Sequence, residues 1–284
     1  MIYYRDKKEY VEERPSSFLK FLYYNPLGRI LLKITITKPI SNIGGFYMNT
    51  RLSKGKIKKF IINNNIDMSE YHKENYKSFN EFFIRKIKVT KRPIPKDENL
   101  LISPADSKVL VYKIDDEVKL NIKNSIYTVA EILKDDKLAR EYKNGYLMIF
   151  RLCVDDYHHY HFIDDGKIIS NKKINGVLNT VQPISDKKCR VFSENSREVS
   201  VLNLKHLGKV IQIEVGALMV GKIKNLDVKT FKRGDEKGYF CFGGSTVVLL
   251  FKENTIDIDN DIIDNSKKGI ETRVKLFEKI GRRK

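Results

Sequence analysis

The chain has 284 residues, 41% of them hydrophobic, and carries 54 Lys/Arg against 36 Asp/Glu for a formal net charge of +18. This length and composition are typical of a globular chain with one large domain or two small ones. Its three cysteines are widely spaced and form no CxxC pair, which argues against a disulfide framework or a zinc site and fits a reducing compartment. The charged N-terminus has no apolar signal region, and no run approaches 18 uncharged apolar residues, so we expect neither a secretory signal nor a spanning helix.

The positive charge is concentrated at the N-terminal end. Residues 1–100 hold 21 Lys/Arg and 10 Asp/Glu, and the segment from Arg14 to Ile66 holds ten Lys/Arg and no acidic residue. An apolar segment with only basic charges is typical of helices at the headgroup boundary of an anionic membrane surface. The alternative is a basic helix packed on its own domain. We expect no nucleic acid partner, because the aromatic residues lie within apolar runs and no RNP or zinc-finger pattern is present.

Helical signals fill the first third of the chain. Ser16 and Ser17 predict the start of a helix that runs from Phe18, Pro26 interrupts it, and residues 27–34 form a second apolar face. Residues 53–92 also have helical spacing, which ends at a proline-containing stretch. We therefore place a boundary near residue 98.

Signals for β-strands dominate after residue 98. We expect strands at 109–112, 145–152, 167–170, 174–181, 199–204, 209–215, 218–223, 239–242 and 247–251, with one helical turn within 127–133. Short turns between such strands favour antiparallel pairing. The expected fold class is α+β: a basic helical membrane-associating region at 1–98, then a mainly antiparallel β-rich catalytic domain at 99–284.

The run Gly243-Gly244-Ser245-Thr246 stands between two expected strands. Two glycines allow strained backbone conformations that expose the Gly244 carbonyl to the Ser245 hydroxyl. After removal of its proton, this hydroxyl attacks the carbonyl and converts the peptide to an ester, and elimination and hydrolysis then leave a pyruvoyl group. The alternative is a glycine turn with a capping serine.

A serine hydroxyl becomes nucleophilic only when a base takes its proton, and histidine oriented by a carboxylate is the usual base near neutral pH. The densest polar cluster, residues 155–161, holds three of the five histidines. The candidate bases are His158, His159 and His161, and the candidate orienting carboxylates are Asp106, Asp155 and Asp156. We expect no metal, because spacings of one to three residues within a loop are not a specific ligand pattern.

Three motifs occur in a fixed order: Ser-Pro-Ala-Asp at 103–106, Asp-Tyr-His-x-x-His at 156–161 and Gly-Ser-Thr at 244–246. This combination resembles the prokaryotic type of the phosphatidylserine decarboxylase family. The flanking stretches at 79–94 and 215–223 are similar to that family as well, as is the C-terminal end at 269–281. The resemblance covers most of the chain from about residue 50.

The resemblance implies a site and a reaction. Asp106, His161 and Ser245 match the self-cleavage triad, with His161 as the base and Asp106 orienting it, and His158 matches the acid/base of decarboxylation. Cleavage between Gly244 and Ser245 implies a β-chain of residues 1–244 and an α-chain of residues 245–284, which begins with a covalent pyruvoyl group and stays in an α/β heterodimer. The implied reaction converts phosphatidylserine to phosphatidylethanolamine and CO2 through a Schiff base on this group. The implied location is peripheral, on the cytoplasmic face of the cell membrane.

Two other functions remain open from the sequence. An ordinary Ser-His-Asp hydrolase is one, although Ser245 does not lie in a GxSxG elbow. A non-enzymatic basic module that binds membranes or nucleic acid is the other. Ser107 in place of a glycine, and the lack of a proline after His161, depart from the family pattern and leave room for a different amino-acid headgroup.

Overall fold

We describe the chain from a computed structural model, which covers residues 1–284 apart from 14–16, 73–74, 123–124, 183–189, 218–221 and 243–244. The helices are α1 (Ser17–Tyr24), α2 (Pro26–Thr35), α3 (Lys38–Asn49), α4 (Ile57–Asn63), α5 (Phe79–Phe83), α6 (Val129–Leu133), α7 (Asp136–Arg140), α8 (Val191–Glu194) and α9 (Asn260–Lys267), with 3₁₀ turns at Arg51–Lys56, Met68–Glu70 and Val89–Lys91. The strands are β1 (Ile2–Tyr4), β2 (Glu9–Val11), β3 (Leu100–Ile102), β4 (Ser107–Lys113), β5 (Lys119–Ile122), β6 (Ser125–Thr128), β7 (Tyr146–Leu152), β8 (His159–His161), β9 (Gly166–Ile174), β10 (Arg197–Leu204), β11 (Gly208–Val215), β12 (Ile223–Asn225), β13 (Thr230–Phe231), β14 (Glu236–Phe240), β15 (Ser245–Phe251), β16 (Ile256–Ile258), β17 (Glu271–Val274) and β18 (Lys279–Arg283).

One ten-stranded sheet organises the molecule, in the order β13-β9-β10-β11-β15-β7-β4-β17-β1-β2. Adjacent strands in this sheet are antiparallel, except for β1 and β17, which are parallel. Smaller sheets β12-β14-β8 and β16-β18-β3 and the hairpin β5-β6 complete the strands. The expected α+β class with mainly antiparallel strands is confirmed. Among the described residues, no helix has the length and apolar character needed to cross a bilayer.

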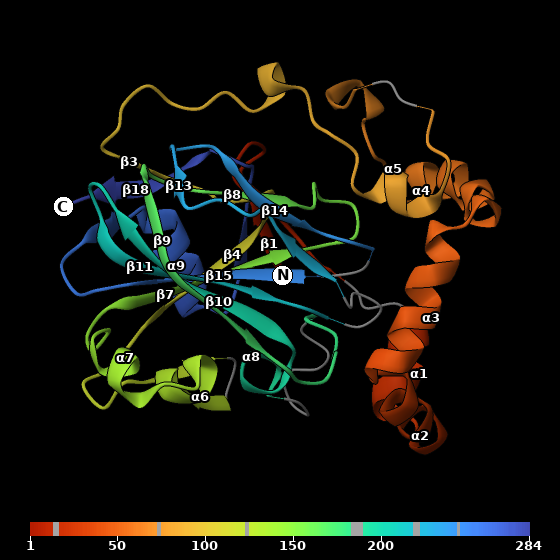
Figure 1. Ribbon diagram of the computed structural model, residues 1–284, viewed down its shortest axis with the longest axis horizontal. Helices are drawn as coiled ribbons and strands as arrows, with labels where there is room; N and C mark the ends of the chain where they lie inside the picture. The colour runs from red at the N-terminus through yellow and green to blue at the C-terminus, as the bar shows by residue number, and fades with distance from the viewer. Residues whose placement is uncertain (14–16, 73–74, 123–124, 183–189, 218–221, 243–244) are drawn as a thin grey trace.

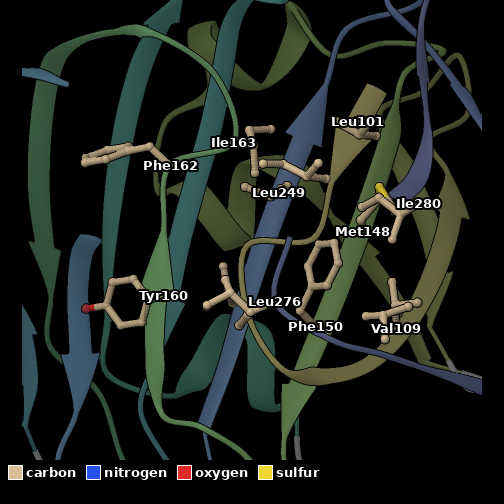
Figure 2. Close-up of a cluster of buried hydrophobic side chains, with 14 of the residues drawn as sticks. Leu101, Val109, Met148, Phe150, Tyr160, Phe162, Ile163, Leu249, Leu276 and Ile280 are labelled. Atoms are coloured by element: carbon tan, nitrogen blue, oxygen red, sulfur yellow. The ribbon is translucent and has the colours of Figure 1, made fainter. Parts of the chain in front are cut away.

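The large sheet buries both faces, so its central strands are apolar throughout. In β15, Val247 and Leu249 enter one core and Val248 and Leu250 enter the other, as the two-residue period of a strand requires. The first core lies against the two three-stranded sheets, and Figure 2 shows side chains from β7, β8, β15 and β18 meeting there. The second core lies against α6 and the β5-β6 hairpin. The large sheet is therefore the middle layer of three.

Helices α1 to α4 lie to one side of the strands, at the right of Figure 1. The expected helix from Phe18 is α1, and the expected break at Pro26 separates it from α2, where Asn25 caps the new helix and proline takes its first position. The two helices cross at Gly28, because a Cβ there would lie 2.0 Å from the Phe21 carbonyl oxygen. The capping position expected at Ser16 lies outside the described residues.

Two parts of the expected strand pattern differ from the structure. Residues 2–11 form β1 and β2 at the edge of the large sheet, before the helical region begins. The strand expected at 174–181 is wrong, because β9 ends at Ile174. The segment that follows forms hydrogen bonds with irregular parts of the chain and not with a neighbouring strand. For example, the Asn179 N–H donates to the Asn195 side-chain oxygen. Gly176 allows this approach, since a Cβ there would lie 2.0 Å from the Glu194 carbonyl oxygen. Residues 218–221 of another expected strand lie outside the described residues.

One buried ion pair joins the large sheet to the β12-β14-β8 sheet. Lys237 of β14 donates to the Glu214 carboxylate of β11 at 2.8 Å, and both side chains are fully buried. Removal of one partner leaves the other charge buried and unpaired, which costs far more than replacing both.

We therefore expect Lys237→Met to lower the free energy of unfolding by about 3 kcal/mol, and Lys237→Met/Glu214→Leu to recover most of that loss. Urea denaturation of the purified protein measures both values. Lys119→Met, which breaks an exposed pair with Glu117, is the control and should change the free energy of unfolding far less than Lys237→Met, because exposed ion pairs contribute little. A double variant no more stable than the single one would contradict this account.

Candidate active site

Ser245 is the first residue of β15, in register with Leu152 of β7. Strand alternation puts its side chain on the face of Val247 and Leu249, toward the core that also contains β8 and β14 residues. The side chain is fully buried, and Oγ has no hydrogen-bond partner among the residues that the structure describes. A buried hydroxyl without a partner is costly, so its position calls for an explanation. Gly243 and Gly244, which precede it, lie outside the described residues.

His161 ends β8 and lies beside the Ser-Pro-Ala-Asp motif. Its backbone N–H donates to the Pro104 carbonyl at 2.9 Å, which fixes the histidine strand against that turn. The ring is nearly buried, and no described residue forms a hydrogen bond with Nδ1. Burial lowers the pKa of His161 to about 4. The imidazole is therefore neutral near pH 7 and free to accept a proton.

His158 is fully buried in the loop that leads into β8. Its Nδ1 lies 2.9 Å from the Asp156 carbonyl oxygen, an acceptor, so Nδ1 carries the proton and Nε2 holds the lone pair. Nε2 has no partner. Burial lowers the pKa of His158 to about 3, and the positive charge of Arg85 acts in the same direction. This ring thus presents an unused proton acceptor inside the protein.

His159 differs from its two neighbours. Its Nδ1 lies 2.8 Å from a Glu236 carboxylate oxygen and its Nε2 lies 3.0 Å from the Ile84 carbonyl oxygen. The ring also stacks on Tyr157 at 4.7 Å. Because both nitrogens are bonded, we assign His159 a structural role. The sequence named all three histidines as candidate bases, and the hydrogen bonds now separate them.

Asp106 makes a paired interaction that the sequence analysis did not foresee. Arg92 Nε donates to Oδ1 at 2.9 Å and Nη2 donates to Oδ2 at 2.6 Å, while the Leu276 N–H donates to Oδ1 at 2.6 Å. No hydrogen bond between described residues joins Asp106 to His161. Their link is the backbone, from His161 N to the carbonyl of Pro104, two residues before Asp106.

Arg92 is thus a site residue that the sequence reasoning missed. The sequence analysis does not single out Arg92, which stands at the proline-containing end of the helical spacing of residues 53–92. Its guanidinium is buried, and Glu70 is a further partner at 3.1 Å. The only sign in the sequence is that Arg92 and Asp106 carry opposite charges. They stand fourteen positions apart, and no local pattern predicts that they form a pair.

Asp156 and Asp155, the other candidate carboxylates, lie near Cys153. Ligand atoms of these three residues lie within 4.8 Å of one another, a geometry that suits a metal ion. However, Asp156 accepts from Lys108 Nζ at 2.8 Å and from the Cys153 N–H at 2.7 Å, and Arg151 Nη1 lies 3.0 Å from the Cys153 sulfur. Two cations already occupy this group, so we interpret it as a buried ion-pair network.

A chain of contacts brings Ser245 toward His158. The Phe240 N–H donates to the His158 carbonyl at 3.0 Å, so β14 runs past the histidine loop. Farther along, the Phe242 ring lies 5.3 Å from Phe83, whose ring lies 4.0 Å from the His158 ring. Ser245 follows Phe242 by three residues, a span of at most about 10 Å. Two phenylalanine rings thus connect the His158 ring to the segment that leads into β15.

A model of the phosphatidylserine decarboxylase family matches residues 79–282. Phosphatidylserine decarboxylase proenzyme 2 of Clostridium acetobutylicum is 59% identical over 283 residues, which cover 99% of this chain and 97% of the relative. The phosphatidylserine decarboxylase proenzymes of Clostridium botulinum (strain 657 / Type Ba4) and Clostridium perfringens are 46% and 40% identical over 298 and 289 residues, and cover 99% and 98% of those relatives.

The chain therefore belongs to the phosphatidylserine decarboxylase family. Its enzyme class is carboxy-lyase, and its relatives carry the name of a zymogen, the proenzyme.

The two unbonded histidines provide a test that does not depend on activity. In the Ser245→Ala protein we expect His158 and His161 to stay neutral from pH 8 down to pH 5, because burial lowers their pKa values to about 3 and about 4. A lowered pKa means that each ring takes its proton only below these values. Nitrogen-15 NMR of labelled histidines measures this, with His158→Gln and His161→Gln for assignment. A midpoint near the ordinary value of about 6.5 for either ring would refute the expectation.

Proposed function

We propose that the chain is a self-processing, pyruvoyl-dependent phosphatidylserine decarboxylase, activated at Ser245. One observation carries the proposal: within the described part of the chain, Ser245 Oγ, His161 Nδ1 and His158 Nε2 are buried and have no hydrogen-bond partner. These atoms belong to residues that match the family motifs. A protein tolerates such unsatisfied polar atoms where chemistry uses them.

The first reaction is the cleavage of the chain itself. Neutral His161 takes the proton of the Ser245 hydroxyl, and Oγ attacks the Gly244 carbonyl carbon, so an ester bond replaces the Gly244–Ser245 peptide bond. Loss of the proton on the Ser245 α-carbon then breaks the ester and leaves a dehydroalanine. Water converts this group to a pyruvoyl group and releases ammonia. Asp106 contributes by holding the turn that carries Pro104, through its bonds to Arg92 and Leu276.

The residues around Ser245 fit a pyruvoyl group. The position is buried and begins a strand that pairs with β11 and β7, and His158 presents a buried nitrogen that has no hydrogen-bond partner among the described residues. Once formed, the pyruvoyl group supplies the electron sink that the loss of CO2 requires. His158 is placed to move the proton that the substrate carbon receives after decarboxylation. Its Asp156 contact keeps Nε2 directed into the site.

The two products of cleavage remain associated. Strand β15, which begins the α-chain, lies between β11 and β7 in the large sheet. Arg5 in the β-chain also bonds to Asp259 and Glu278 in the α-chain, at 2.9 Å each. We therefore assign an α/β heterodimer whose interface is the core of the sheet.

We propose further that α1 to α4 attach the enzyme to the membrane, as a peripheral protein on the cytoplasmic face. Several apolar side chains on these helices are exposed, among them Leu27, Ile30 and Phe46 at 72%, 61% and 76%. Exposed apolar groups within a purely basic segment suit an anionic bilayer. Phosphatidylserine is itself anionic, so the same surface gathers the substrate. The division near residue 98 into a membrane-associating part and a catalytic part remains a prediction.

Self-cleavage is tested by the intact mass of denatured, purified protein. We expect fragments of residues 1–244 and 245–284 from the wild type, the smaller one without a free amino terminus. Ser245→Ala and His161→Ala should stay uncut, because the first removes the nucleophile and the second its base. Ser200→Ala and His206→Ala, which lie outside the site, are the matched controls and should cleave. An uncut but active wild type would move the assignment to a Ser-His-Asp hydrolase.

Membrane attachment is tested by flotation with vesicles of phosphatidylserine and phosphatidylcholine. Leu27→Ser/Ile30→Ser should lower binding by at least about tenfold, since each apolar side chain withdrawn from the bilayer costs about 1.5–3 kcal/mol. Ile126→Ser/Ile169→Ser removes equally exposed side chains of the β-rich part and should leave binding unchanged. If both double variants lost vesicle binding equally, the proposed membrane-binding surface on the helices would be wrong.

A further inference from the structure

The chain segment that follows α5 lies against the loop that carries His158. The Phe83 ring, at the end of α5, lies 4.0 Å from the His158 ring. Arg85 Nη2 donates to the Asp155 carbonyl at 3.1 Å. The next carbonyl along the chain, that of Asp156, lies 2.9 Å from His158 Nδ1 and accepts a hydrogen bond from it. Arg85 and His158 therefore bond to adjacent carbonyls of one turn, so the arginine holds in place the group that orients the histidine ring.

Arg85 is a buried cation without an ion-pair partner among the described residues. Its side chain is 1% exposed. The guanidinium donates to neutral oxygens of Phe82, Tyr71 and Asp155, and Nε has no partner in the described part of the chain. The Tyr71 and Phe82 rings lie 4.3 and 4.9 Å from it, but such contacts offset only part of the cost of burying a charge. A buried charge without a counter-ion acts strongly on titratable groups near it, here the His158 ring.

The other charged side chains near that ring form two clusters in which opposite charges meet. Their members are Lys108, Asp155 and Asp156 on one side and Lys86, His159 and Glu236 on the other. The closest N···O distance is 2.8 Å in each cluster. Opposite charges this close largely cancel at the ring, so the arginine is the charge that remains.

Both effects of Arg85 act on the same atom, His158 Nε2. The bond to Asp155 keeps the turn in place, so Nδ1 remains the protonated nitrogen and Nε2 holds the lone pair. Burial lowers the pKa of His158 to about 3, and the arginine is the strongest of the nearby charges that act in the same direction. An unprotonated Nε2 can accept the proton that a substrate amino group loses when it reacts, and can return this proton to the substrate carbon.

We propose that Arg85 is a positioning residue for His158: it holds the turn that directs the ring, and its unpaired charge keeps Nε2 free of a proton. The proposal deepens the proposed function and rests on it, because His158 is the proton-transfer group of that reaction. The cost of burying an arginine without a counter-ion is then explained by the state that it imposes on the neighbouring histidine.

The first experiment separates the charge of Arg85 from its hydrogen bond. Nitrogen-15 NMR of the histidines in the Ser245→Ala protein reports the protonation of His158 Nε2, and the amide spectrum checks that the protein is folded. Arg85→Gln keeps a donor for the Asp155 carbonyl but removes the charge, so we expect the His158 midpoint to rise by about one pH unit. At pH 4.5, roughly a quarter of the rings would then carry a second proton, instead of roughly 3%.

Arg85→Met removes the donor as well as the charge. We expect the turn to loosen, so that the two nitrogens of His158 share the proton at pH 7 and the Nε2 signal moves toward that of a protonated nitrogen. In Arg85→Gln the proton should remain on Nδ1 at this pH. The same spectra measure both variants.

Two control variants separate these effects from a general loss of packing. Phe82→Leu loosens the same contacts but keeps the arginine, and Arg197→Gln removes another buried arginine, which bonds to backbone carbonyls. Neither control should change the His158 signals. If Arg85→Gln left His158 unprotonated at pH 4.5, or if Phe82→Leu protonated it to the same extent, the proposal would be wrong.

A kinetic measurement tests the proposal in the processed enzyme. Arg85→Met should lower kcat for phosphatidylserine in mixed micelles by about tenfold or more, because a misdirected ring transfers its proton poorly. KM should change little, since Arg85 does not contact the substrate, and self-cleavage should be complete, since His161 is its base. A raised KM with an unchanged kcat would make Arg85 a substrate-binding residue and overturn the proposal. If Arg85→Met does not fold, the Arg85→Gln titration decides the proposal by itself.

The two measurements also separate this proposal from the proposed function, because the titration needs no activity. If Arg85→Gln protonates His158 as expected but the wild type does not decarboxylate phosphatidylserine, the proposed function is wrong and the control of His158 by Arg85 stands. Decarboxylation by the wild type, with unchanged His158 signals in both Arg85 variants, would refute the positioning role alone.

Discussion

The position of β15 between β11 and β7 is the constraint on which the rest of the structure depends. Its register fixes which residues face each core, so one residue of slippage would exchange Ser245 and Thr246 between the two faces. Because Val247 to Leu250 are buried on both sides, the register is strongly specified. The direction of the Ser245 side chain is therefore set by apolar side chains that take no part in the proposed chemistry.

A second layer, the β12-β14-β8 sheet, carries the end of the histidine motif. Strand β8 belongs to a small sheet, and its position relative to the large sheet depends on buried polar contacts such as Lys237 with Glu214. The histidine loop is held in turn by the Asp156 pair with Lys108, which lies on β4 of the large sheet. These charged pairs are costly to bury, but they define one arrangement of the two sheets where apolar contacts alone would permit several.

The sequence predicted individual strands and motifs well, but it predicted contacts between residues far apart in the chain poorly. Clear apolar runs in the sequence located β4, β7, β10, β11 and β15, because each of these is a buried strand. The motif order predicts Asp106, His158, His161 and Ser245 as site residues, and three of them carry a buried atom without a hydrogen-bond partner in the described part of the chain. Periodicity could not show that Arg92 pairs with Asp106, since such a contact depends on how separate elements pack. For the same reason, it could not show that β1 pairs with β17 across the whole chain.

The pairing of β1 with β17 also sets an order of events during synthesis. Strand β17 lies between β1 and β4, so both keep an open edge until residues 271–274 have been made. The large sheet likewise stays divided at β11 and β7 until β15 emerges. The basic helices α1 and α2 leave the ribosome long before either strand. Under the proposed membrane attachment, the chain would reach a lipid surface before β15 and β17 complete the sheet, so translation itself would delay the proposed activation at Ser245.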